Sequence, residues 1–245
     1  MGCCESRDKS SKPVENINIT YNLISKESKD LQIQQITSVK DPKIQEILLH
    51  TKELDSKDDW DSVVQETNLQ IKKRQGSKYS QDLIVSKLQF TFDNQVPLSL
   101  LLDELNIGAN RKQWDTNFKI FENIEEDSPN NFLLYSVFSV LFFKTEYLER
   151  KSVVFQNNTV FVVVYSIEDE RKPIDKSVTR AHTHFGVMAI ADKDNKTEMT
   201  VFNQTDPNST MAKMGTALGI KALKGWADTL KKRVSKVMSS RNNVG

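Results

Sequence analysis

The chain has 245 residues, of which 38% are hydrophobic and 27% charged, and its formal net charge is +1. A chain of this length can bury one sizeable core, and it lacks the strongly basic character that marks nucleic-acid binding. No apolar run approaches the roughly 20 residues that span a bilayer, and the polar N-terminus lacks the core of a signal peptide. We therefore expect one cytosolic domain with a tail, and no nucleic-acid partner.

The N-terminus begins MGCCES, which places Gly2 behind the initiator Met and Ser6 at the favoured position of the myristoylation pattern. Cys3 and Cys4 are the only cysteines of the chain and are available for palmitate. One myristoyl chain gives only marginal membrane binding, at about 10⁴ M⁻¹, whereas a second acyl chain makes anchoring stable. We predict lipidation at Gly2, Cys3 and Cys4, and a location at the cytosolic face of the plasma membrane or an endomembrane.

The next stretch is rich in Ser, Lys, Asn, Gln and Glu, so residues 1–40 are expected to form a flexible tether. Asp41 and Pro42 then have the pattern of an N-cap followed by proline at the first helical position, and apolar residues recur at helical spacing to Leu54. The domain is expected to start here and to extend over residues 41–238, with a tail at 239–245.

After this first helix, the chain alternates between short apolar strands and helical segments. We predict three strands, then a helix that Pro97 opens, then a helical turn and a further strand. Their ranges are 62–66, 69–73, 83–92, 97–106, 111–115 and 118–124.

A run of long strands follows, because its segments are rich in β-branched and aromatic residues and are bounded by Asn- and Asp-containing turns. These turns predict hairpins and therefore an antiparallel sheet. In residues 132–143 both alternating sets are largely apolar, so both faces of the sheet need cover. The predicted strands are 132–143, 146–155, 159–167, 177–190 and 197–202, and a last helix with one apolar arc covers 210–238.

Four motifs, in this order, resemble the START family (steroidogenic acute regulatory protein-related lipid transfer). They are Trp60 after the first helix, Arg111-x-x-Trp114-Asp115, Val178-Thr179-Arg180-Ala181, and Thr205-Asp206-Pro207. The resemblance covers about residues 41–238. It implies an α+β, helix-grip fold, in which a curved antiparallel sheet wraps around a long C-terminal helix, and it implies a lipid ligand.

Two positions depart from the pattern of that family. Asn208-Ser209 and Ala212 stand where the family usually has two glycines and a later proline. Thr145-Glu146 stands where the family has an Arg-Asp pair. The hinge into the last helix and one polar contact at the strand are therefore expected to differ.

In such a fold, the last helix would close a cavity for a single lipid. Arg180 would orient the polar end of the lipid, and as a buried charge it needs an acid such as Glu146 or Glu149, or a lipid head group. The candidate cavity residues are Arg180, His182, His184, Glu146, Tyr135, Trp226 and Leu223.

The basic face of the last helix suggests a second contact, with anionic lipid. Its candidate membrane-contact residues are Lys231, Lys232 and Lys236. His182 and His184 have H-x-H spacing, but no third ligand is nearby in sequence, so no metal is predicted. No nucleotide-binding or hydrolase motif occurs, and we predict no catalytic residue and no cofactor.

We therefore predict a monomeric, membrane-anchored protein that binds a sterol, phospholipid or sphingolipid for local transfer or sensing, and that is not an enzyme. Two alternatives stay open. In one, the domain is an acyl-anchored adaptor that binds a protein partner. In the other, it is an enzyme on the helix-grip scaffold, which would need an acid, base or nucleophile in the cavity.

Overall fold

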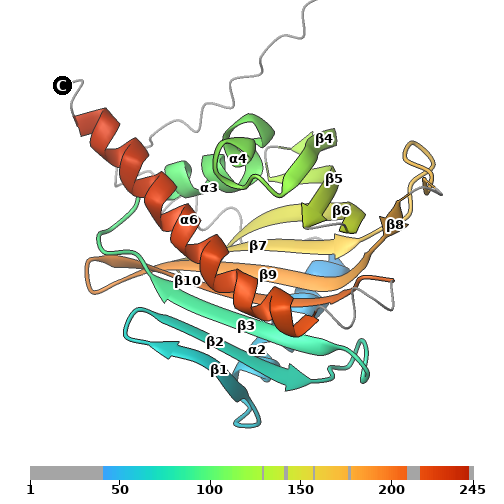
Figure 1. Ribbon diagram of the computed structural model, residues 1–245, viewed down its shortest axis with the longest axis horizontal. Coiled ribbons are helices and arrows are strands. Elements are labelled where there is room, and N and C mark those ends of the chain that lie inside the picture. Colours follow the sequence, from blue (N-terminus) through green and yellow to red (C-terminus); the bar gives the residue numbers. More distant parts are fainter. Residues whose placement is uncertain are drawn as a thin grey trace, which may run out of the picture.

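The computed structural model describes residues 41–128, 130–140, 143–156, 158–175, 178–208 and 216–242. One large sheet and several helices make up this part of the chain (Figure 1). The helices are α2 (Pro42–Asp55), α3 (Leu98–Asn106), α4 (Gly108–Trp114) and α6 (Thr216–Asn242). The strands are β1 (Asp61–Glu66), β2 (Leu69–Gln75), β3 (Ile84–Thr91), β4 (Phe118–Ser128), β5 (Asn131–Val140), β6 (Phe143–Gln156), β7 (Thr159–Ser166), β8 (Thr179–Arg180), β9 (His182–Lys193) and β10 (Lys196–Asp206).

The sheet has the strand order β1-β2-β3-β10-β9-β7-β6-β5-β4. Neighbours along this path pair antiparallel, and the short β8 pairs parallel with β6. The observed order of elements is the predicted one: a helix, three strands, two helices, the strand run and a last helix. The predicted strand 177–190 is divided into β8 and β9, and α6 extends to Asn242, past residue 238 where we place the end of the domain.

The hairpin turns have the backbone that their side chains predict. Asn158, between β6 and β7, has φ 62°, and Asp194 and Asn195, between β9 and β10, have φ 51° and 59°. Asn and Asp tolerate this left-handed conformation better than most residues. The turn chemistry thus fixes which strands are neighbours.

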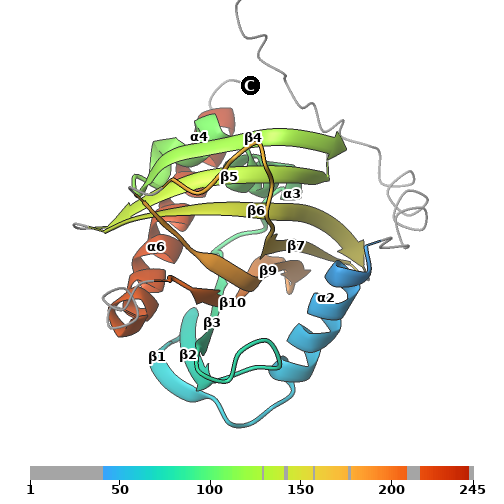
Figure 2. The same cartoon turned by 90° about the vertical axis from the view of Figure 1, so that its right-hand side faces the viewer.

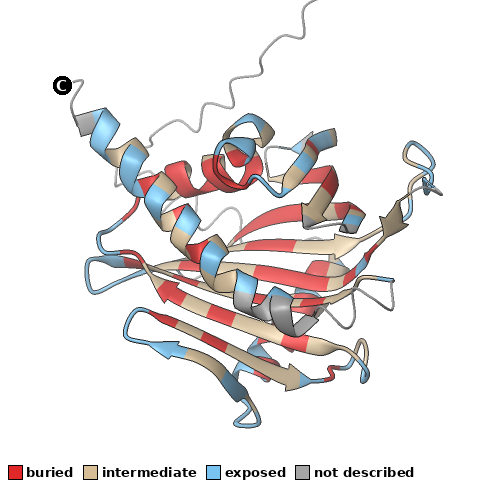
Figure 3. Cartoon of the chain, in the orientation of Figure 1, coloured by how far each residue is buried: buried red, intermediate tan, exposed pale blue. Residues whose placement is uncertain are grey.

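Helices cover both faces of the sheet, as its largely apolar strands require. We call the face that packs against α3, α4 and α6 the inner face, and the face that packs against α2 the outer face. Figure 2 shows α6 on one side of the sheet and α2 on the other. The inner core includes Leu101, Trp114 and Leu230, and the outer core includes Ile47 and Phe185. Figure 3 shows buried residues along the middle of the sheet and on α3.

Candidate functional site

Strand β6 carries two buried, oppositely charged side chains on the inner face. It pairs with β5 and β7 without a register shift, so its side chains alternate between the faces. Val153 packs in the inner core, and Val154 packs in the outer core. Glu149 and Lys151 share the face of Val153, and they are 9% and 3% exposed. Both charges therefore lie inside the fold, on the side that α6 covers.

The amine of Lys151 is held at the end of α3. Its Nζ donates to the backbone carbonyl of Leu105 at 3.1 Å and lies 5.6 Å from the ring centroids of both Phe121 and Phe132. Burial, and then the positive charge of Arg111, lower the pKa of Lys151 to about 7, although the neighbouring glutamate opposes this shift. Near neutral pH this amine can be charged or neutral, and both forms can donate a hydrogen bond to a ligand oxygen.

Glu149 is perturbed in the opposite direction. Burial raises its pKa, while a hydrogen bond from Thr183 and the charge of Lys151 act to lower it. Tyr147 follows at the next position on the same face, and burial together with the negative charge of Glu149 raises the pKa of its hydroxyl. Residues 147, 149 and 151 therefore line the inner face with a phenol, an acid and an amine.

The Arg-x-x-Trp-Asp motif forms a second polar group beside this row. Arg111 Nη2 donates to Asp115 Oδ2 at 2.8 Å, and these side chains are 7% and 4% exposed. The guanidinium carbon lies 4.3 Å from the Trp114 ring centroid and 5.6 Å from that of Trp226. Burial lowers the pKa of Arg111 to about 10. A Cβ at Gly108 would lie 2.5 Å from a backbone carbonyl of β4, so glycine lets α4 approach β4 this closely.

Two ion pairs hold α6 against the rest of the domain. Arg233 Nε lies 2.9 Å from Glu104 Oε2, and its Nη2 lies 3.1 Å from Glu104 Oε1. A bidentate ion pair therefore joins α6 to α3. The Glu104 side chain is 3% exposed. Near the other end of the helix, Lys224 Nζ lies 2.7 Å from Glu66 of β1.

The two predicted α6 residues, Trp226 and Leu223, face the sheet as expected. Leu223 packs against the inner core, and the Trp226 ring centroid lies 6.0 Å from that of Trp114 and 6.2 Å from that of Phe90. The apolar arc of the predicted last helix is therefore buried against the inner face.

Arg180, Glu146 and Tyr135 also lie together, but on the outer face. Arg180 Nε donates to Glu146 Oε1 at 2.8 Å, and the Tyr135 hydroxyl donates to Glu146 Oε2 at 3.0 Å. Glu146 alternates with Glu149 and Lys151 along β6 and shares the face of Val154. The predicted acid partner of Arg180 is thus present. The expectation that this cluster faces α6 is wrong, because the register of β6 places Glu146 on the outer face.

The histidine pair is placed in the same way. Thr183 is buried and hydrogen-bonded to the inward Glu149, so His182 beside it points to the outer face. A register shift between Thr183 and Phe185 interrupts the alternation, and the charge of Lys43 on α2 acts on His184, so His184 lies on the outer face as well. Their ring centroids are 4.8 Å apart, and His182 is exposed. Across the described residues, no group of three or more His, Cys, Asp or Glu side chains is arranged to hold a metal ion.

The predicted membrane-contact lysines lie along α6. Lys232 and Lys236 are exposed, while Lys231 is partly buried with its Nζ 5.5 Å from the Phe90 ring centroid. A hollow of about 430 Å³ beside the end of the helix is lined by Arg233, Lys236, Val237, Ser240 and Arg241. No helix in the described ranges combines the length and the apolar character needed to cross a bilayer. The predicted lipidation residues Gly2, Cys3 and Cys4 lie outside the described residues.

Lys151 was not predicted from the sequence, and Glu149 was predicted only as a possible partner of Arg180. A signal for the pair exists, because two opposite charges stand two positions apart in a strand and are followed by Val153 and Val154. Alternation in a strand puts such charges on one face. The pattern does not say which face is the inner one.

Comparisons with known proteins agree with this architecture. A sequence model of the START domain family matches residues 46–235. A search of curated proteins finds no match. The structure is similar to the crystal structure of human STARD10, with 17% identity over 84% of this chain and 85% of that chain and a TM-score of 0.72. It is also similar to the human StAR-related lipid transfer protein 5, with 13% identity over 80% of this chain and 98% of that chain and a TM-score of 0.65.

Proposed function

The chain belongs to the START domain family, and from this premise we propose that it binds a single lipid molecule between the inner face of its sheet and α6. The lipid would be a sterol, a phospholipid or a sphingolipid, and the domain would transfer or sense it locally. The name of the similar human StAR-related lipid transfer protein 5 describes lipid transfer, which supports this proposal.

The observation that carries the proposal is the inward row of Tyr147, Glu149 and Lys151, in which the acid and the amine are buried. Polar and charged groups are costly to bury without partners, and Lys151 has a pKa near neutrality for that reason. The surrounding inner core is apolar and aromatic. A lipid matches this environment, because its hydrocarbon body would contact the core while its polar end would accept a hydrogen bond from Lys151.

The N-terminal sequence supports a permanent membrane location. Myristate at Gly2 and palmitate at Cys3 or Cys4 would hold the domain at the cytosolic face of a membrane. Exposed lysines on α6 would add attraction to anionic lipid, at about 1 kcal/mol for each lysine near the surface. Such a protein would exchange lipid at one membrane or at a contact between two, rather than carry it over long distances.

Native mass spectrometry tests the lipid-binding proposal. We expect wild-type protein, incubated with vesicles of phosphatidylcholine, phosphatidylserine and cholesterol, to carry one added lipid mass. Lys151→Met should lower the loaded fraction at least fivefold, because it removes the donor to the polar end of the lipid. Lys144→Met changes an exposed lysine of the same strand and should load like wild type.

Two results would contradict the proposal. One is a wild-type protein that carries no lipid mass from these vesicles. The other is equal loading of wild type and Lys151→Met, provided that urea unfolding shows both proteins to be folded; it would mean that Lys151 does not touch the ligand.

A further inference from the structure

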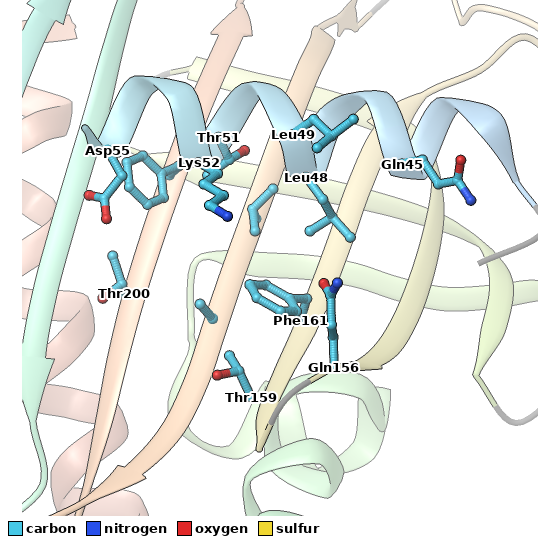
Figure 4. A pocket seen from close by; sticks show the side chains of 13 residues that line it. Gln45, Leu48, Leu49, Thr51, Lys52, Asp55, Gln156, Thr159, Phe161 and Thr200 are labelled. Carbon is cyan, nitrogen blue, oxygen red and sulfur yellow. The ribbon is translucent and has the colours of Figure 1, made fainter. Parts of the chain in front are cut away.

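A partly apolar groove runs along the outer face beside α2, on the side of the sheet opposite to the proposed lipid site; polar side chains, among them Lys52, Asp55 and Gln156, also line it. Its volume is about 590 Å³. Leu48 and Leu49 of α2 form one wall, and Phe161 of the sheet lies opposite them (Figure 4). Ala189 of the sheet also lines the groove. The α2 lining extends from Gln45 to residue 55, which corresponds to about 15 Å of helix at 1.5 Å per residue.

The groove exists because α2 covers one row of outward side chains and leaves the next row open. Val163, Val187 and Phe202 are adjacent across three strands and pack in the outer core under α2. The next row of paired residues contains Phe161 and Ala189. The small Ala189 side chain leaves the hollow, and a helix that packed fully onto this row would have no open apolar floor beside it.

The wall residue Leu49 is unusually exposed for a large apolar side chain. Leu49 is 69% exposed, although Ile44, Ile47 and Leu54 of the same helix are buried and Leu48 is partly buried. A large apolar side chain at the rim of an apolar groove gains from cover by an apolar ligand.

We propose that this groove holds the acyl chain attached to Gly2 of the same protein. This inference rests on the acylation in the proposed function. Asp41, the first described residue, caps α2 and accepts a hydrogen bond from the Tyr165 hydroxyl at 2.8 Å. Gln45, one turn further, already lines the groove. The N-terminal segment that would carry the acyl chain therefore joins the domain at the end of the groove.

The length of that segment suits an intramolecular ligand. Gly2 precedes Asp41 by 39 positions (41 − 2). A random-coil chain of about 39 residues has a root-mean-square end-to-end distance of roughly 31–37 Å, which exceeds the groove length. A tether of this kind holds its ligand at an effective concentration of the order of millimolar.

Docking would compete with the membrane for a single acyl chain. If the groove binds a myristoyl group about as well as a bilayer does, at about 10⁴ M⁻¹, millimolar effective concentration gives a docked-to-free ratio of about ten. A protein that carries myristate alone would then bind membranes weakly, because its acyl chain stays in the groove. A palmitoyl group at Cys3 or Cys4 would make its membrane binding stable.

The test uses the full chain with Cys3→Ser and Cys4→Ser, coexpressed with an N-myristoyltransferase, and vesicles of phosphatidylcholine. Ala189→Phe fills the groove and should raise the ratio of vesicle-bound to free protein about tenfold. Ile174→Phe is the control, because Ile174 is also a large exposed apolar side chain, at 65%, and does not line the groove; it should leave the ratio unchanged. Leu49→Glu alters an exposed wall residue, so it should fold normally and raise the ratio in the same direction.

Intact mass and size-exclusion chromatography separate the other outcomes. If Ala189→Phe and Leu49→Glu both leave the ratio within twofold of the parent, the groove does not hold the acyl chain, and the proposed anchor is unaffected. If the parent associates with itself and Ala189→Phe abolishes this, the occupant is a second copy and the inference is wrong. If the intact mass of the parent shows no acyl group, both the groove proposal and the anchor proposal are wrong. The mass of Gly2→Ala is the reference for protein without myristate. The lipid-loading experiment on Lys151 is a separate measurement, and none of these three outcomes affects it.

Discussion

Arg180 is held by several acceptors at once. Its Nε donates to Glu146, while Nη2 donates to the carbonyls of Lys172 at 3.1 Å and Pro173 at 3.4 Å. The side chain of Arg180 is 14% exposed and that of Glu146 is 1% exposed. The planar guanidinium can satisfy the carboxylate and the connection between β7 and β8 together, which a lysine could not do in the same geometry. The residue therefore fixes this connection on the outer face.

We expect Arg180→Met to lower the free energy of unfolding by about 3 kcal/mol, because it would leave the buried Glu146 side chain without its ion-pair partner. Urea unfolding of lipid-free protein measures this change. Arg171→Met is the control, since the Arg171 side chain is 48% exposed and ion pairs in solvent contribute little to stability. Equal midpoints for wild type and Arg180→Met would show that the ion pair does not stabilise the fold.

The α2 helix is held on the outer face by a small apolar interface that includes a histidine. His50 is 4% exposed, and its ring centroid lies 5.2 Å from that of Tyr79 and 5.6 Å from that of Phe185. Burial and the charge of Lys78 lower the pKa of His50, whereas Glu53, 3.7 Å from Nδ1, acts to raise it. The neutral form of the His50 ring is therefore the one that packs between α2 and the sheet.

This interface should weaken in mild acid. The pKa of His50 is lower in the folded chain than in the unfolded chain, so as pH falls below about 7 the unfolded chain binds the proton first and is favoured. Stability should fall with pH, by at most about 1.4 kcal/mol per pH unit for one group. Urea unfolding from pH 7.5 to 5 should show that the free energy of unfolding falls less steeply with falling pH for His50→Leu than for wild type. Parallel curves for wild type and His50→Leu would contradict this role.

At the scale of the whole molecule, the formal net charge of +1 hides an uneven distribution of charge. Lys232 and Lys236 are exposed on α6, and Arg233 and Arg241 line the hollow near its end. The two lysines can approach anionic lipid while the inner side of α6 stays packed, which would place the proposed lipid site beside the membrane.

We expect Lys232→Glu together with Lys236→Glu to reduce binding to phosphatidylserine-containing vesicles by at least about 2 kcal/mol, or roughly thirtyfold, at low salt. The melting temperature should stay nearly the same, because exposed charges add little stability. Lys52→Glu with Lys57→Glu makes the same change of charge on α2 and on the turn that follows it, across the sheet, and should have a smaller effect. If both double variants lose binding equally, net charge rather than the α6 surface attracts the membrane.

Several features could be predicted from the sequence because they depend on local physics. The N-cap at Asp41, the alternation in the strands and the Asn and Asp turns predicted the elements and their order, and the ordered motifs predicted the family. The face of each strand could not be predicted, because both faces of this sheet are apolar and α6 and α2 cover one each. Alternation separates Glu146 from Lys151, but only packing shows that Lys151 lies on the inner face, against the end of α3. The tertiary structure therefore decided which charges belong to the candidate lipid site.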